Sequence, residues 1–87
     1  MRVPTLDELL AYRGEEGILR IPSAGAGSQK QPPLYARVRV VDARYAAQRI
    51  HLLVTPLGGS GEQWVWLSRV QLDKERLNEA ARQVHNR

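Results

Sequence analysis

Apolar and polar residues alternate with a period of two over residues 34–42 and 49–55, and this pattern constrains the fold more than any other. One face of the two stretches is apolar and consists of Ala36, Val38, Val40, Ile50, Leu52 and Val54, whereas the other face is mostly polar and includes Val41 and Leu53. Successive side chains of a strand point to opposite faces of a sheet, so each stretch buries one face and exposes the other. The sequence therefore predicts two half-buried strands of an antiparallel sheet.

Three further stretches are expected to complete this sheet. Residues 17–22 predict a short strand that ends at Pro22 or lies at an edge, because proline cannot donate to a strand ladder. Residues 63–67 are apolar on both faces, which favours a central strand. Residues 68–72 predict one more short strand or a turn. We expect the connections to be residues 44–48 and a longer hairpin loop over 56–61.

Two helices are predicted to flank the sheet. Residues 6–12 begin with a capping box formed by Thr5 and Glu8, and Gly14 supplies a stop. Residues 73–86 begin with Asp73 as the N-cap. The apolar stripe of this second helix consists of Leu77, Ala80, Ala81 and Val84. The first helix is too short to be stable alone in water, so its leucines are expected to dock on the sheet.

Residues 23–33 contain small and polar side chains without a large apolar anchor. Gly25 and Gly27 loosely resemble a phosphate-cradling loop, but the spacing of that motif and the helix that should follow it are both missing. We therefore predict a flexible loop here.

The size and composition of the chain favour one domain, residues 1–87, in the cytoplasm. A chain of 87 residues is long enough for one domain and too short for two. It has no cysteine, so neither a disulfide nor a thiolate ligand or nucleophile is available. The first residues lack the apolar region of a signal peptide, and no stretch approaches the ~20 apolar residues that span a bilayer. We expect a soluble cytoplasmic protein with no membrane partner.

The succession of strand, strand, hairpin loop, strand and closing turn over residues 34–72 resembles an SH3-like small β-barrel. The residues that carry the resemblance are 36–40, 49–55 and 63–72. It implies a mainly β, α+β protein in which a small antiparallel barrel is flanked by a short N-terminal helix and a C-terminal helix. Barrels of this kind serve as readers of nucleic acid or peptides and as assembly modules. The resemblance thus implies a binding module and leaves its ligand open.

Positive charge is concentrated on the predicted sheet. The net charge is +4, whereas residues 17–72 alone hold seven basic and two acidic residues, a local balance of +5. A localised basic face attracts phosphates or an acidic protein surface. Codon bias is an alternative explanation for the basic residues, because eleven of the thirteen are arginine, as a GC-rich genome would encode.

A candidate nucleic-acid surface follows from the same alternation, on the face opposite the apolar positions. Its expected members are Arg37, Arg39, Arg49 and His51, with Arg44 and Tyr45 at the rim. Arginine makes bidentate contacts to phosphate and stacks on bases. The alternative is an ordinary solvated exterior, since charged outward residues are common on half-exposed strands.

Trp64 and Trp66 share one face of their strand, and the register with residues 49–55 decides which face is buried. Opposition of Val54 and Trp64 would place both indoles in the core, whereas opposition of Val54 and Val65 would place them with the arginines. We expect them in the core, because a small core without phenylalanine needs their area. If they lie outside, Trp64, Trp66 and Arg69 form a possible interface.

Catalysis is not expected. His51 and His85 are the only histidines, and neither has a carboxylate and a nucleophile at a meaningful spacing. Two histidines without further ligands do not predict a metal site. We expect no metal, no small-molecule cofactor and no enzymatic activity.

Two functions remain open. The first is a non-enzymatic module that binds DNA or RNA through the basic sheet face, largely independently of sequence, because phosphate contacts carry no base information. The alternative is a protein–protein interaction or adaptor module, or a small homo-oligomer, whose interface is Trp64 and Trp66 or the N-terminal helix.

Overall fold

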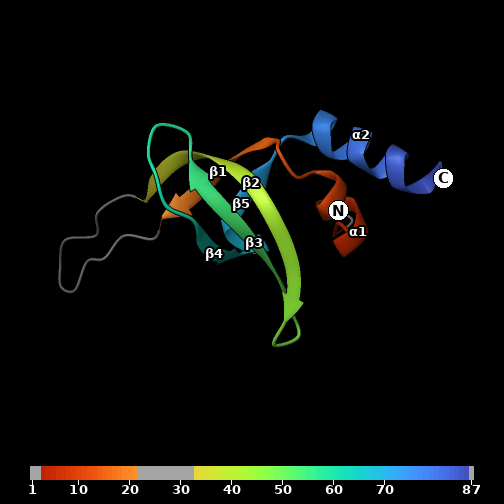
Figure 1. Cartoon of the computed structure of the whole chain (residues 1–87), viewed down its shortest axis with the longest axis horizontal. Coiled ribbons are helices and arrows are strands. Elements are labelled where there is room, and N and C mark those ends of the chain that lie inside the picture. The colour runs from red at the N-terminus through yellow and green to blue at the C-terminus, as the bar shows by residue number, and fades with distance from the viewer. Residues whose placement is uncertain (1–2, 22–32, 87) are drawn as a thin grey trace.

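The computed structural model describes residues 3–21 and 33–86 as a five-stranded antiparallel sheet with two helices (Figure 1). Along the chain the elements are α1 (Leu6–Ala11), β1 (Glu16–Ile21), β2 (Leu34–Ala46), β3 (Arg49–Pro56), β4 (Gln63–Trp66), the 3-10 turn η1 (Leu67–Arg69), β5 (Val70–Leu72) and α2 (Lys74–His85). This confirms the predicted α+β class with a short N-terminal and a C-terminal helix. The predicted flexible loop 23–33 lies, except for residue 33, outside the described residues.

The sheet is open, so the expected closed barrel is absent. The strand order is β4-β3-β2-β1-β5, which makes β4 and β5 the two edges. These two strands have only four and three residues, and the single turn of η1 connects them without a ladder between them. The prediction of a central strand at residues 63–67 is therefore wrong. Of the two alternatives for the strand before Pro22, the first holds: β1 ends at Ile21, and it is not an edge strand because it lies between β2 and β5.

The hairpin of β2 and β3 is longer than predicted. β2 continues to Ala46, so Arg44 and Tyr45 belong to the strand and not to a connection. The turn consists of only Ala47 and Gln48, whose φ angles of 51° and 62° are left-handed. Both residues of a two-residue hairpin turn commonly need positive φ. A register shift between Val40 and Asp42 marks a bulge in β2, which is the strongly curved strand of Figure 1.

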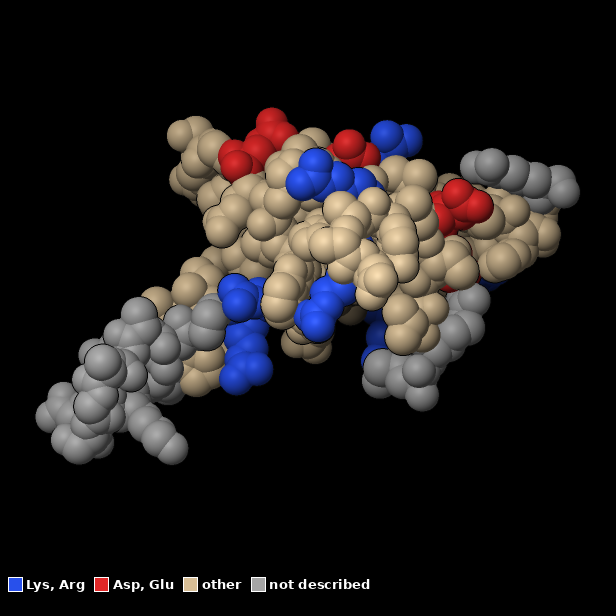
Figure 2. All heavy atoms as spheres, turned by 90° about the horizontal axis from the view of Figure 1, so that it is seen from below, with Lys and Arg blue, Asp and Glu red and all other residues tan. Residues whose placement is uncertain are grey.

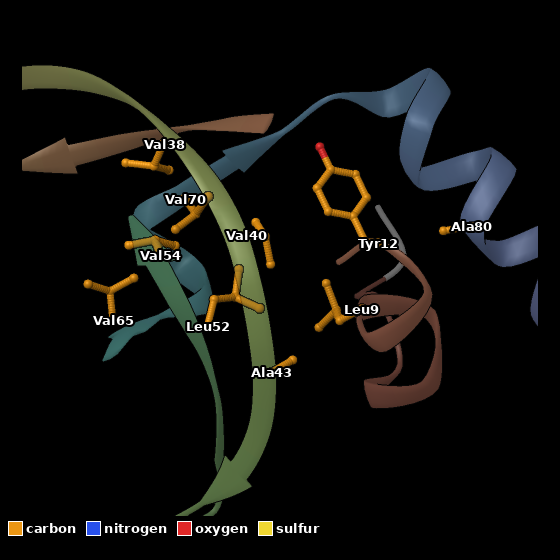
Figure 3. Packing of buried hydrophobic residues seen from close by; sticks show 10 residues of the cluster. All are labelled: Leu9, Tyr12, Val38, Val40, Ala43, Leu52, Val54, Val65, Val70 and Ala80. Carbon is orange, nitrogen blue, oxygen red and sulfur yellow. The ribbon is translucent and has the colours of Figure 1, made fainter. Parts of the chain in front are cut away.

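The core lies between the inner face of the sheet and α1 (Figure 3). Its buried members are Leu9, Tyr12, Val38, Val40, Ala43, Leu52, Val54, Val65, Val70 and Ala80. The predicted inward alternation of β2 and β3 is thus confirmed, with Ala36 and Ile50 half-buried at its ends. Gly17 opposes Val38 on the same inner face, and a methyl added to it would lie 3.0 Å from Val70 Cγ1, so glycine permits the close approach of β1 and β5.

α1 is short, and it is held by its cap and by its buried side chains. Thr5 Oγ1 accepts from the amide of Glu8, and the carboxylate of Glu8 accepts from the amide of Thr5, which completes the predicted capping box. Leu9 and Tyr12 are fully buried. The chain leaves the helix through Gly14, whose φ is +91° and whose amide donates to Val40 O at 2.7 Å. Packing on the sheet therefore stabilises a helix that propensity alone would not.

α2 packs beside α1 at one end of the sheet (Figure 1). Asp73 accepts from the amides of Glu75 and Arg76, as predicted for its N-cap. Ala80 and Ala81 are buried, whereas Leu77 and Val84 are half-buried. Across residues 3–21 and 33–86, no helix has the length and apolar character needed to cross a membrane.

Candidate nucleic-acid interface

Trp64 and Trp66 lie on the outer face of the sheet, contrary to the expectation that they fill the core. In β3 and β4, Leu53 opposes Trp64, His51 opposes Trp66 and Leu52 opposes Val65. Directly opposed residues share a face, so Val65 joins the core and both indoles point outward. Trp66 is 43% exposed, and Trp64 is half-buried.

The core does not need the indoles because α1 supplies large side chains of its own. Tyr12 and Leu9 are the two largest fully buried residues, and both come from this helix or its cap. They lie beside Val40 and Leu52 in the core (Figure 3). The register places the tryptophans on the opposite face of the sheet. Leu9 and Tyr12 therefore fill the part of the core that the indoles were expected to fill.

Three arginines pack against the two outward indoles. The Arg44 Cζ atom lies 4.2 Å from the centre of the Trp64 ring. The Cζ atoms of Arg49 and Arg69 lie 4.4 Å and 5.6 Å from the centre of the Trp66 ring. These distances are within the range of cation–π contacts. We call these five residues the Arg–Trp cluster; its arginines are all exposed.

The arginines of the Arg–Trp cluster are not neutralised by ion pairs within the described part of the chain. The ion pairs there join Arg76 to Glu15, Arg82 to Glu79 and His85 to Glu8. The nearest acidic position by register is Asp42, which opposes Leu53 on the same face and accepts from the amide of Ala43 at 2.8 Å. The guanidinium groups are thus oriented by aromatic rings while their charge stays available.

Arg37 and Arg39 share the outer face with the Arg–Trp cluster but lie at the other end of the hairpin. Arg39 opposes Thr55, six residues along β3 from Arg49. At ~3.3 Å per residue this corresponds to about 20 Å. Arg39 also donates to Gly14 O at 2.6 Å and opposes Glu16 on β1. The predicted surface is therefore divided into two groups.

Tyr45 and His51, the other two predicted site residues, differ in their positions. Tyr45 is 63% exposed but opposes Ile50, so it belongs to the inner face and not to the arginine surface. His51 lies on the outer face in the row between Arg44 and Trp66. Its Nδ1 atom is buried and has no hydrogen-bond partner within the described part of the chain. His51 therefore belongs to the sheet surface between Arg44 and Trp66, and it is less exposed than the arginines of the Arg–Trp cluster.

His85 has a partner that sequence spacing did not suggest. Its Nε2 atom lies 3.1 Å from Glu8 Oε2, whose side chain is fully buried. The two residues are far apart in sequence, and only the packing of α2 against α1 brings them together. Among residues 3–21 and 33–86, no group of three or more His, Cys, Asp or Glu side chains has the arrangement of a metal site.

The stacking of arginine on tryptophan was not predicted, although a signal for it exists. Trp64 and Trp66 are separated by one residue, and arginines stand at both ends of the β2–β3 turn. In the view of Figure 2, Lys and Arg side chains form separate groups with uncharged side chains between them. The positive charge is therefore not one continuous patch on that face, and the aromatic contacts distinguish one group of arginines from the others.

Comparison with known proteins gives no relative for this chain. No protein-family model, no curated protein and no solved structure matches it.

Proposed function

We propose that the protein is a small non-catalytic module that binds nucleic acid through the outer face of its sheet. The contacts are made mainly to phosphates, by Arg44, Arg49 and Arg69, with Arg37 and Arg39 as a second group. Because phosphates are the same at every nucleotide, binding is largely independent of base sequence.

The observation that carries the proposal is the packing of exposed arginines on outward tryptophans. Arg44 over Trp64 and Arg49 over Trp66 are cation–π contacts at 4.2 Å and 4.4 Å. Proteins that bind single-stranded nucleic acid combine basic side chains with aromatic surfaces in this way. A ring that holds a guanidinium in place also reduces the entropy that the side chain loses on binding phosphate.

The resemblance to SH3-like barrels supports the class of binding module. We propose that the chain is an open form of such a barrel. The succession of β2, β3, hairpin loop, β4, η1 and β5 follows the pattern on which the resemblance rests. An open sheet leaves its outer face and the edge strand β4 accessible to a ligand.

The contacts of the two histidines favour a non-catalytic role. His85 is engaged by Glu8, and His51 lies between Arg44 and Trp66 in the sheet. A general base needs a nucleophile or a bound water within hydrogen-bond reach and a third group that orients it. Glu8 could orient His85, but the described contacts give neither histidine a nucleophilic side chain within hydrogen-bond distance.

A protein partner is the second candidate. A hollow beside β3, η1 and α2 is lined in part by Ile50, Leu67 and Leu77, which are half-buried apolar residues. The leucines of α1 do not support this alternative, because Leu9 is buried and Leu6 and Leu10 pack against the core.

Fluorescence anisotropy with labelled single- and double-stranded DNA and RNA at two salt concentrations tests the proposal. We expect binding at low salt that weakens steeply as salt rises, because phosphate contacts release counterions. An interface centred on tryptophan and apolar side chains would change little over the same range. Absence of binding to every nucleic acid at low salt would contradict the proposal and favour the protein partner.

A further inference from the structure

We infer that the Arg–Trp cluster is a stacking site for two neighbouring unpaired bases, so that the preferred ligand is single-stranded nucleic acid. This inference rests on the proposed function and makes it more specific. Each guanidinium lies between an indole on the protein side and a base on the solvent side. Arg44 over Trp64 forms the first position, and Arg49 over Trp66 forms the second.

The spacing of the two positions favours unstacked bases. Trp64 and Trp66 are two residues apart on β4 and point to the same side. At ~3.3 Å per residue, their backbone positions are about 6.6 Å apart. Neighbouring bases of a duplex are separated by only ~3.4 Å along the axis. A strand that places one base on each position must therefore be extended, which a base-paired duplex does not permit.

The chemistry of the arginines suits this arrangement. A guanidinium is planar, so one side can rest on an indole while the other receives a base, and its N–H groups at the rim remain free to donate to a phosphate. Unpaired bases commonly stack on guanidinium planes as well as on aromatic rings. The described contacts pair neither Arg44 nor Arg49 with a carboxylate that would withdraw it from the ligand.

The position of the Arg–Trp cluster also leaves it accessible to a nucleic-acid ligand. Trp66 is 43% exposed and lies on β4, the edge of the sheet, so no further strand of the described chain covers it. Arg69 approaches the same ring from η1 at 5.6 Å and adds a third positive charge next to the second position. A phosphate that flanks the base at the second position would therefore meet a further cation.

Replacing arginine by lysine separates stacking from charge. The double variant Arg44→Lys/Arg49→Lys keeps both positive charges but removes both planar groups. Its affinity should be measured by anisotropy for a twelve-nucleotide oligo(dT), for an abasic strand of the same length and for a duplex of the same length. Circular dichroism and thermal unfolding of the variant verify that it is folded.

We expect the parent protein to bind oligo(dT) at least about tenfold more tightly than the abasic strand or the duplex, since each stacked base contributes about one power of ten or more. The double variant should lose this preference, because its affinity for oligo(dT) should fall by a larger factor than its affinity for the abasic strand. Equal binding of all three ligands by the parent, or a double variant that retains the preference for oligo(dT), would overturn the stacking site and leave phosphate binding intact. Absence of binding to all three ligands at low salt would overturn both proposals.

Discussion

Tyr12 connects three elements through one hydroxyl group. It donates to Glu16 O at the start of β1 and accepts from the amide of Asp73, the N-cap of α2. Its ring is fully buried in the core. The hydroxyl thus links the ends of α1, β1 and α2, and burial raises the pKa of this phenol above its ordinary value of 10.0, because the ionised form loses hydration.

Tyr12→Phe tests this link. The variant keeps the ring but leaves Glu16 O and the amide of Asp73 without this partner, so we expect the free energy of unfolding in urea to fall by about 1–2 kcal/mol at neutral pH. A change below a few tenths of a kcal/mol would show that water replaces the hydroxyl fully.

The same variant gives a pH test. Since the folded state raises the pKa of Tyr12, the unfolded state ionises first, and stability that is complete below about pH 10 should be lost as the pH rises further. Urea midpoints measured across this range should fall less steeply in Tyr12→Phe than in the parent. All other residues are the same in both proteins, so the difference between the two curves reports Tyr12. Parallel curves would contradict the assignment to Tyr12.

At the scale of the elements, alternation predicted the faces of β2 and β3, and the caps predicted both helices. The extent of β2 was missed because Ala47 and Gln48 lack the Asn-Gly signature of a two-residue turn, so a longer connection was expected. The face of Trp64 and Trp66 depends on the register that the loop between β3 and β4 imposes, and a shift of one residue exchanges the faces. Local sequence contains no information that fixes this register.

The backbone of the β2–β3 turn is strained, and a substitution can remove this strain. Ala47 and Gln48 both adopt left-handed φ angles, which cost about 1 kcal/mol for a residue with a Cβ. The variant Ala47→Asn/Gln48→Gly should therefore increase the free energy of unfolding by about 1 kcal/mol, after the greater chain entropy of glycine is subtracted. Thermal unfolding gives the measurement. Gln48→Ala, which keeps the strain, is the matched control and should leave stability unchanged; a destabilised Asn-Gly variant would contradict this account of the turn.

The packing of α2 through its small residues can be tested by one substitution at two positions. Ala80 is 4% exposed against the core, so Ala80→Arg introduces both excess volume and an unpaired charge and should cost at least about 2 kcal/mol. Gln83 is exposed on the same helix, and Gln83→Arg should stay within ~0.5 kcal/mol of the parent. Equal melting temperatures of the two variants would mean that α2 does not depend on this contact.

At the scale of the whole molecule, one curved sheet separates the core from the surface that we propose binds the ligand. Its inner face, covered by α1, holds the apolar positions, and its outer face holds two groups of arginines at opposite ends of the β2–β3 hairpin. The group with Arg37 and Arg39 lies about 20 Å along the ladder from Arg49. A strand of nucleic acid that runs along the hairpin can therefore contact both groups at once, whereas neither group can influence the other through direct contact.

This separation predicts additive effects on binding. In the variant Arg37→Ala/Arg39→Ala, each lost phosphate contact should reduce the magnitude of the log–log salt slope for a long oligo(dT) by about 0.7. The variant Arg44→Ala/Arg49→Ala should reduce the slope similarly, and it should also lose the stacking of bases on the two guanidinium groups. Because substitutions more than ~7–10 Å apart usually add, the fourfold variant should lose the sum of the two binding free energies within ~0.5 kcal/mol.

Arg82→Ala on α2 is the control for these binding measurements, because Arg82 pairs with Glu79 and lies outside the β2–β3 hairpin. Its salt slope should equal that of the parent. If the Arg37→Ala/Arg39→Ala variant has the same salt slope as the parent, the ligand contacts only the Arg–Trp cluster. Coupling well above 0.5 kcal/mol between the two groups would instead mean that they contact the same few phosphates, which the extended hairpin does not allow, and the arrangement of the ligand along β2 and β3 would then be wrong.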